Sequence, residues 1–229
     1  MNRNYQKELD RILEEIQKEE KVSRLFLHSC CAPCSSYVLE YLSPYFEITD
    51  FFYNPNISPR EEYEKRTKEL QKLIEEMPLV HKPVFLEGEY RPEDFFEMAK
   101  RLENVPEGGE RCFKCYRLRL EEAARLAAEG GYDYFATTLT ISPLKNAAKL
   151  NEIGEELEKI YHVKHLPLIL RSAMVTSAPQ NCLQNISYIV RIIVAVYFPD
   201  RNGKDRDKIQ CIKNVKWKSR KVLAGIVIK

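Results

Sequence analysis

The sequence predicts an α/β protein in which a parallel sheet carries helices on both faces, followed by an atypical C-terminal tail. Short apolar, β-branched and aromatic runs alternate with segments of helical periodicity up to Leu166, as expected for parallel strands joined by crossover helices. The charge changes abruptly there. Residues 167–229 hold 12 basic and 3 acidic side chains, against 24 and 31 in residues 1–166. We therefore predict an α/β domain over residues 1–166 and a basic tail over residues 167–229.

The first predicted helix and strand lead to a cysteine-rich turn. Four aliphatic residues recur at helical spacing near the start of the chain and predict an amphipathic helix: Leu9, Ile12, Leu13 and Ile16. The apolar run 25–27 predicts a strand. A helix is expected over residues 35–42, because Pro33 suits the first turn of a helix.

Two further strand and helix pairs follow. The aromatic and β-branched run 47–53 predicts a strand that ends in the turn 54–59, where two prolines disfavour helix. A helix is expected from the end of this turn to Glu76. Residues 80–86 predict a third strand, and residues 92–102 predict a short helix that begins at a proline.

The last part of the α/β domain repeats the same alternation. Its elements are expected as a helix over 112–128, a strand over 132–140, a helix over 145–160 and a strand over 163–166. In parallel sheets, ligands gather at the carboxyl ends of the strands. We therefore expect the cysteine turn, the turn 54–59 and residues 137–145 to share one edge of the sheet.

Five of the seven cysteines fall into two tight clusters. The members are Cys30, Cys31 and Cys34 in the first, and Cys112 and Cys115 in the second. Vicinal cysteines rarely bond to each other, because successive strand side chains diverge and a disulfide needs converging Cβ vectors. The first cluster precedes a helix, whose N-terminus favours the thiolate form that metals bind. Four sulfurs from two loops suit a [4Fe-4S] cluster, whereas the spacing also fits structural zinc or, for the second pair, a thioredoxin-like dithiol.

Polar residues after the predicted strands are candidates for binding a base, a ribose or a phosphate. The candidate substrate contacts are Asn54, Asn56, Arg66, Ser142 and Lys145. Turn formation and helix capping explain the same residue types equally well, and Arg66 is also typical of a solvated helix face. His28 is as compatible with a core position as with proton donation.

The composition argues against secretion and membrane insertion. Residues 1–24 are densely charged, where a signal peptide needs an apolar stretch. The longest nearly apolar run, 186–198, contains Arg191 and is shorter than the ~20 residues of a membrane-spanning helix. We therefore expect a cytoplasmic protein with no membrane partner, in which clustered cysteines favour metal binding or redox catalysis over structural disulfides.

Four motifs taken together resemble the QueH-type epoxyqueuosine reductases. They are Cys30-Cys31-Ala32-Pro33-Cys34, Phe52-Tyr53-Asn54-Pro55-Asn56-Ile57 with Glu62-Tyr63 and Arg66, Arg111-Cys112-x-x-Cys115-Tyr116-x-x-Arg119, and Thr137-Thr138-Leu139-x-Ile141-Ser142-Pro143 with Lys145. The resemblance covers about residues 20–166 and implies an adenine-nucleotide-α-hydrolase-like fold of the HUP or Rossmann-like class. It also implies reduction of the epoxide of epoxyqueuosine to queuosine at the wobble position of the tRNA anticodon, the last step of queuosine biosynthesis.

The same resemblance implies a cofactor and partners. By position, the ligands of the family's [4Fe-4S] cluster correspond to Cys30, Cys31, Cys112 and Cys115. Cys34 is a candidate ligand for one additional metal ion. The implied partners are tRNA carrying epoxyqueuosine and an electron donor that the sequence does not identify. The rival interpretation is a zinc-stabilised nucleotide- or RNA-binding module without redox activity.

The tail departs from the family pattern. The family carries a C-terminal Tyr-Cys-Gly-Cys motif whose cysteines form a redox-active disulfide, and this sequence contains no such motif. Cys182 and Cys211 stand in other surroundings, so no catalytic residue is assigned. With compatible codons, an offset of two bases turns residues 188–198 into a run that contains Tyr-Cys-Gly-Cys. This leads to the hypothesis that the tail is out of frame, with an inactive reductase as one consequence.

Overall fold

A computed structural model describes residues 3–19, 21–142 and 144–169 of the chain. In these residues, parallel strands form one five-stranded sheet in the order β3-β2-β1-β4-β5. The strands are β1 (Ser23–Ser29), β2 (Phe46–Phe52), β3 (Val84–Glu87), β4 (Tyr134–Thr137) and β5 (Lys164–His165). The helices are α1 (Tyr5–Ile16), α2 (Ala32–Leu42), α3 (Arg60–Glu76), α4 (Pro92–Ala99), α5 (Glu110–Glu129), α6 (Ala147–Tyr161) and the 3-10 helix η1 (Thr138–Ile141). The predicted α/β class is confirmed.

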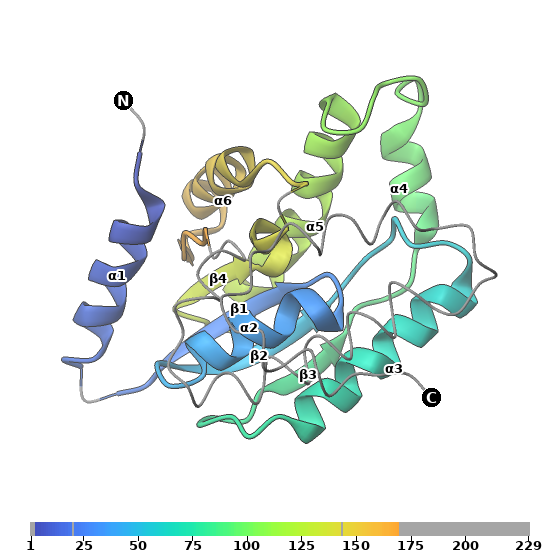
Figure 1. Cartoon of the computed structure of the whole chain (residues 1–229). Coiled ribbons are helices and arrows are strands. Elements are labelled where there is room, and N and C mark those ends of the chain that lie inside the picture. The colour runs from blue at the N-terminus through green and yellow to red at the C-terminus, as the bar shows by residue number, and fades with distance from the viewer. Residues whose placement is uncertain (1–2, 20, 143, 170–229) are drawn as a thin grey trace, which may run out of the picture. The chain divides into compact units, whose positions relative to one another are not determined.

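Helices cover both faces of the sheet (Figure 1). Helices α2 and α3 lie on one face, and α5 and α6 lie on the other. Because alternate residues of a strand point to opposite faces, Phe26 of β1 and Phe51 of β2 pack toward α5 and α6, where they join one hydrophobic cluster with Leu120 and Leu150. Burial of this cluster supplies the main driving force that holds α5 and α6 on the sheet.

The order of the strands creates a switch point between β1 and β4. From β1 the chain runs outward through β2 to β3 at one edge, and then returns to β4 on the other side of β1. Neighbouring strands whose connections lead in opposite directions leave a crevice at their carboxyl ends. The turn after β1 carries the first cysteine cluster, so this cluster lies at the crevice.

Three strands are shorter than the sequence predicts, among them β5, which covers only Lys164–His165 of the predicted 163–166. Strand β4 pairs with β1 only as far as Thr137, whose hydroxyl then accepts a hydrogen bond from the Leu139 N–H at 3.2 Å and starts η1. The residues expected to complete a strand up to residue 140 therefore form a 3-10 turn. Strand β3 begins at Val84 rather than at residue 80, because Pro83 has no N–H to donate to the strand ladder.

Two expectations about the whole chain concern membrane-spanning helices and the basic tail. None of the helices in the described ranges is long and apolar enough to cross a membrane. Most of the predicted basic tail falls in residues 170–229, outside the described residues. The predicted boundary at Leu166 and the frame hypothesis therefore stay predictions.

Gly154 in α6 lies against the buried ring of His165 in β5. A Cβ added at Gly154 would lie 2.3 Å from Cδ2 and Nε2 of His165. The imidazole has little room to withdraw, since His165 is buried and its ring centroid lies 5.3 Å from that of Phe135. Alanine usually stabilises a helix interior by about 1 kcal/mol over glycine, but overpacking reverses the sign here. We expect Gly154→Ala to lower the free energy of unfolding by about 2 kcal/mol in urea denaturation.

The control for this prediction removes the clashing ring. The double variant Gly154→Ala, His165→Ala should lose less stability than the two single variants together, because the added methyl group then has space. A single Gly154→Ala variant as stable as the wild type would contradict the expected clash.

Candidate metal centre

The first cysteine cluster lies where β1 ends and α2 begins. Cys31 occupies the N-cap position of α2 in an extended conformation, and its side chain does not cap the helix. Pro33 lies in the first turn and helps to end the strand and start the helix. The three Sγ atoms of Cys30, Cys31 and Cys34 all lie within 4.8 Å of one another. A short loop thus brings three sulfurs to one point.

The spacing of these sulfurs suits a shared metal ion. The Sγ atoms of Cys30 and Cys31 lie 3.7 Å apart. Two thiolates at the usual metal–sulfur distance of a tetrahedral site would lie about 3.8 Å apart. A hydrogen bond with the thiol of Cys31, together with burial, raises the pKa of Cys30 to about 12. Hydrogen bonds with Cys30 and Cys31, together with burial, also raise the pKa of Cys34. The direction of both shifts is opposite to the expectation that the helix N-terminus favours thiolates. A bound cation would supply the missing positive charge.

The second pair of cysteines belongs to the first turns of α5. Cys112 is half-buried and its Sγ accepts a hydrogen bond from the Gly108 N–H at 3.2 Å, whereas Cys115 is buried. In the described ranges, no group of three or more metal-ligating side chains includes either of them. Both Cys30 and Cys112 nevertheless pack against the hydrophobic cluster between the sheet and α5. The predicted ligand set of Cys30, Cys31, Cys112 and Cys115 stays a prediction.

A buried hydrogen-bond chain joins the two cysteine-bearing segments. The Arg119 Nε donates to the carbonyl oxygen of Cys115 at 3.2 Å, and its Nη1 donates to Oδ1 of Asn54 at 3.2 Å. The Asn54 amide in turn donates to the carbonyl oxygen of Ser29, next to Cys30, at 2.9 Å. Both Arg119 and Asn54 are almost fully buried. The chain ties α5 to the ends of β1 and β2.

His28 ties three strand ends together beneath the site. Its Nε2 lies 3.0 Å from the carbonyl oxygen of Tyr53 and its Nδ1 lies 2.9 Å from the hydroxyl of Thr137. A carbonyl can only accept, so Nε2 carries the proton and Nδ1 accepts from the hydroxyl. Burial, reinforced by the charge of Arg119, lowers the pKa of His28 to about 3. Of the two alternatives that the sequence left open, the core position is the one that the structure supports.

Two further groups lie beside the cysteine turn: Thr138, which belongs to one of the four motifs, and Asp50, which was not recognised in the sequence as part of the site. The Thr138 hydroxyl accepts from the Cys30 N–H at 3.2 Å and donates to the Cys30 Sγ at 3.6 Å. Asp50 is fully buried in β2 and accepts from the Ser29 hydroxyl at 2.9 Å. A carboxylate that directly precedes the apolar pair Phe51-Phe52 in strand 46–52 was the available signal for Asp50. Both groups hold the turn that presents the cysteines.

The predicted substrate contacts occupy different environments. Asn54 is buried and its amide is bound on both sides, as described above, whereas Asn56 is exposed in the turn after β2. Arg66 pairs with Glu62 on α3 at 2.8 Å. Ser142 and Lys145 follow η1 and are half-buried. Their roles toward a substrate remain predictions.

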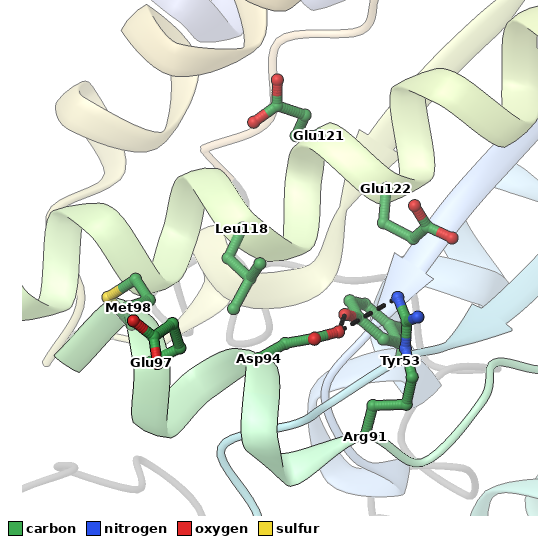
Figure 2. Close-up of a pocket in the computed structure, with 8 residues that line it drawn as sticks. All are labelled: Tyr53, Arg91, Asp94, Glu97, Met98, Leu118, Glu121 and Glu122. Atoms are coloured by element: carbon green, nitrogen blue, oxygen red, sulfur yellow. Dashed lines mark hydrogen bonds and ion pairs between the residues drawn. The ribbon is translucent and has the colours of Figure 1, made fainter. Parts of the chain in front are cut away.

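A cavity of about 470 Å³ lies between α4 and α5, apart from the cysteines (Figure 2). Its lining residues are Tyr53, Arg91, Asp94, Glu97, Met98, Leu118, Glu121 and Glu122. Asp94 accepts a hydrogen bond from the Tyr53 hydroxyl at 3.2 Å and pairs with Arg91 at 3.1 Å. No cysteine and none of the predicted substrate contacts lines this cavity. Glu97, Glu121 and Glu122 each form an ion pair with a basic side chain. The negative charge of the lining is therefore already balanced without a bound cation.

Comparison with known proteins identifies relatives across most of the chain. A family model described as epoxyqueuosine reductase QueH matches residues 25–188. A protein of Staphylococcus epidermidis named epoxyqueuosine reductase QueH is 43% identical over 168 residues, which cover 72% of this chain and 71% of that protein. Proteins of the same name from Streptococcus pyogenes and Staphylococcus aureus are both 40% identical, covering 73% and 72% of this chain and 68% and 70% of their own lengths. The matched range includes both cysteine clusters.

Proposed function

Because this chain belongs to the QueH family of epoxyqueuosine reductases, we propose that it reduces the epoxide of epoxyqueuosine in tRNA to queuosine. In this reaction two electrons and two protons remove the epoxide oxygen as water, and a carbon–carbon double bond forms. The observation that carries the proposal is the convergence of three cysteine sulfurs at the carboxyl edge of the sheet, inside the range that the family model matches. The protein is thereby an oxidoreductase of tRNA modification.

We further propose that an iron–sulfur centre transfers the electrons. Cys30 and Cys31 of the β1–α2 turn and Cys112 and Cys115 of α5 would hold a [4Fe-4S] cluster, and Cys34 would contribute to an additional metal ion. Such a cluster supplies single electrons at low potential when bound. The residues of the chain support this use: Thr138 holds Cys30 by two hydrogen bonds, and crowded thiols favour a cation.

The proposed partners are tRNA carrying epoxyqueuosine and a separate electron donor, and the proposed location is the cytoplasm. For contact with tRNA we retain Asn56, Arg66, Ser142 and Lys145 as candidates, since the described residues carry more acidic than basic side chains and binding must use local contacts. Asn54 would reach a nucleotide only by exchanging its internal hydrogen bonds.

The test is conversion of the tRNA base by the purified chain. Protein reconstituted with iron and sulfide without oxygen is mixed with dithionite and tRNA from a strain that accumulates epoxyqueuosine. Mass spectrometry of the digested tRNA should show the nucleoside losing the mass of one oxygen. Because the chain has no Tyr-Cys-Gly-Cys motif, dithionite should support turnover better than a protein reductant. Unchanged epoxyqueuosine with a cluster-loaded, dithionite-reduced protein would contradict the proposal.

A further inference from the structure

We propose that Arg119 is the counter-charge of the cysteine centre, and that it also holds the two cysteine-bearing segments in register. Here Arg119 acts as a positioning residue that raises the reduction potential of the bound cluster. The inference rests on the proposed function, since it concerns the cluster that the two segments would share.

The first observation is that Arg119 is a buried cation without a carboxylate partner. Its exposed fraction is 4%, and its two observed acceptors are neutral oxygens, the Cys115 carbonyl and the Asn54 amide. No acidic side chain in the described ranges forms an ion pair with it. Two other arginines of α5, Arg117 and Arg125, are only partly buried and pair with glutamates. A guanidinium stays charged in proteins, so burying one calls for negative charge nearby.

The positive charge of Arg119 lies close to both cysteine-bearing segments. The Arg119 guanidinium lies 3.2 Å from the carbonyl oxygen of Cys115 and 3.2 Å from Oδ1 of Asn54, and the Asn54 amide lies 2.9 Å from the carbonyl oxygen of Ser29, next to Cys30. Its positive field therefore reaches both the end of β1 and the first turns of α5. These are the segments that carry the proposed cluster ligands.

The second observation is the direction of its hydrogen bonds. Arg119 donates to the carbonyl of Cys115 on one side and to Asn54 on the other, and Asn54 donates to the carbonyl of Ser29, next to Cys30. The same guanidinium therefore links Cys115, a member of one predicted ligand pair, through Asn54 to Ser29, which directly precedes the other pair. A residue with this placement can set both the separation of the segments and the charge between them.

The electrostatic consequence has a definite sign. Reduction adds one negative charge to a cluster, and a fixed positive charge in a low-dielectric site stabilises the reduced form more than the oxidised form. Arg119 should therefore raise the midpoint potential. Removing its charge should shift the potential to more negative values, while a lysine in its place should keep most of the effect.

The experiment compares midpoint potentials in variants of the full chain. Arg119→Gln removes the charge and keeps a hydrogen-bond donor, and Arg119→Lys keeps the charge. Arg117→Gln is the matched control, because it removes a partly exposed charge from the same helix. Reconstituted proteins are titrated with dithionite, and the reduced cluster is followed by electron paramagnetic resonance. We expect a negative shift for Arg119→Gln that clearly exceeds the shifts for Arg119→Lys and Arg117→Gln.

A second variant keeps the test decisive if Arg119→Gln does not fold. Asn54→Asp places a carboxylate against the same guanidinium, so it should also shift the potential to more negative values. The decisive measurement is the midpoint potential of Arg119→Gln or of Asn54→Asp, each with full iron and sulfide content. A value equal to that of the wild type would overturn the inference and leave the proposed function intact. A wild-type chain that takes up no iron would instead overturn the proposed cofactor, and the inference with it.

Discussion

Serine in place of Cys30 or Cys115 is expected to abolish the proposed iron–sulfur centre and reduce the proposed epoxide turnover to background. Each substitution removes one of four thiolates that come from two segments, and a serine hydroxyl is a poor ligand for iron at neutral pH. The same result is expected for the remaining two proposed ligands, Cys31 and Cys112. The wild-type protein, purified without oxygen, should be brown and lose its charge-transfer absorbance in each variant. Iron and sulfide analysis provides the measurement.

Two further variants, Cys34→Ser and Cys182→Ser, are the matched controls. They distinguish the four proposed ligands from the three sulfurs that lie together in the structure. The sulfurs of Cys30, Cys31 and Cys34 lie together, whereas Cys112 and Cys115 belong to a separate segment. We expect Cys34→Ser to keep the brown cluster and to lose only additional bound metal. Cys182→Ser, outside both clusters, should behave as the wild type. A colourless, zinc-loaded wild type, or a Cys112→Ser variant with full iron content, would contradict the proposed cluster.

Replacement of Asp50 by asparagine is expected to stabilise the protein above neutral pH. Burial raises the pKa of Asp50 from 3.8 to about 7, although the Ser29 hydroxyl opposes this shift. Its Oδ1 is also buried without a hydrogen-bond partner. Because the folded pKa is higher than the unfolded one, the folded state binds more protons between about pH 4 and pH 7. Stability therefore falls as pH rises through this window, by an amount on the order of 4 kcal/mol if the shift is fully realised.

The measurement is urea denaturation of the wild type and Asp50→Asn at pH 5 and pH 8. Asparagine resembles the protonated carboxyl, so its advantage should grow from pH 5 to pH 8. The exposed Glu14→Gln is the control and should leave the pH dependence of the wild type unchanged. An advantage of Asp50→Asn that is the same at both pH values would show that the carboxyl is not buried as described.

The order of the elements was predictable because it depends on local pattern. Helical periodicity marks α1, whose buried side chains Leu9, Leu13 and Ile16 are three of the four residues that predicted it. Proline and glycine mark most of the turns, and the rule for parallel sheets places the turns after β1, β2 and β4 at one edge. The register of the strands bears this out, since Ser29 pairs with Phe52 and His28 with Thr137.

The features that the sequence did not predict have a common cause in tertiary contacts. Residues 138–140 have strong strand propensity, yet β1 turns into the cysteine loop at this level and leaves them no partner. Asn54 was predicted as a substrate contact from its residue type, and this role stays a prediction; what the residue type did not predict is that Arg119 and the Ser29 carbonyl bond its amide. No local pattern reveals that a residue about 65 positions away will supply the partner.

The sequence by itself determined the α/β class, the family and the two cysteine clusters, because periodicity, turn residues and motif spacing are properties of neighbouring residues. Only the tertiary structure decided that the sulfurs of Cys30, Cys31 and Cys34 converge, that His28 is a hydrogen-bonded core residue, and that Arg119 lies buried between the two segments. These features depend on which strand ends meet at the switch point and on how deeply each charge is removed from water. Burial and long-range pairing arise only when the sheet assembles, and they set the charge balance of the site.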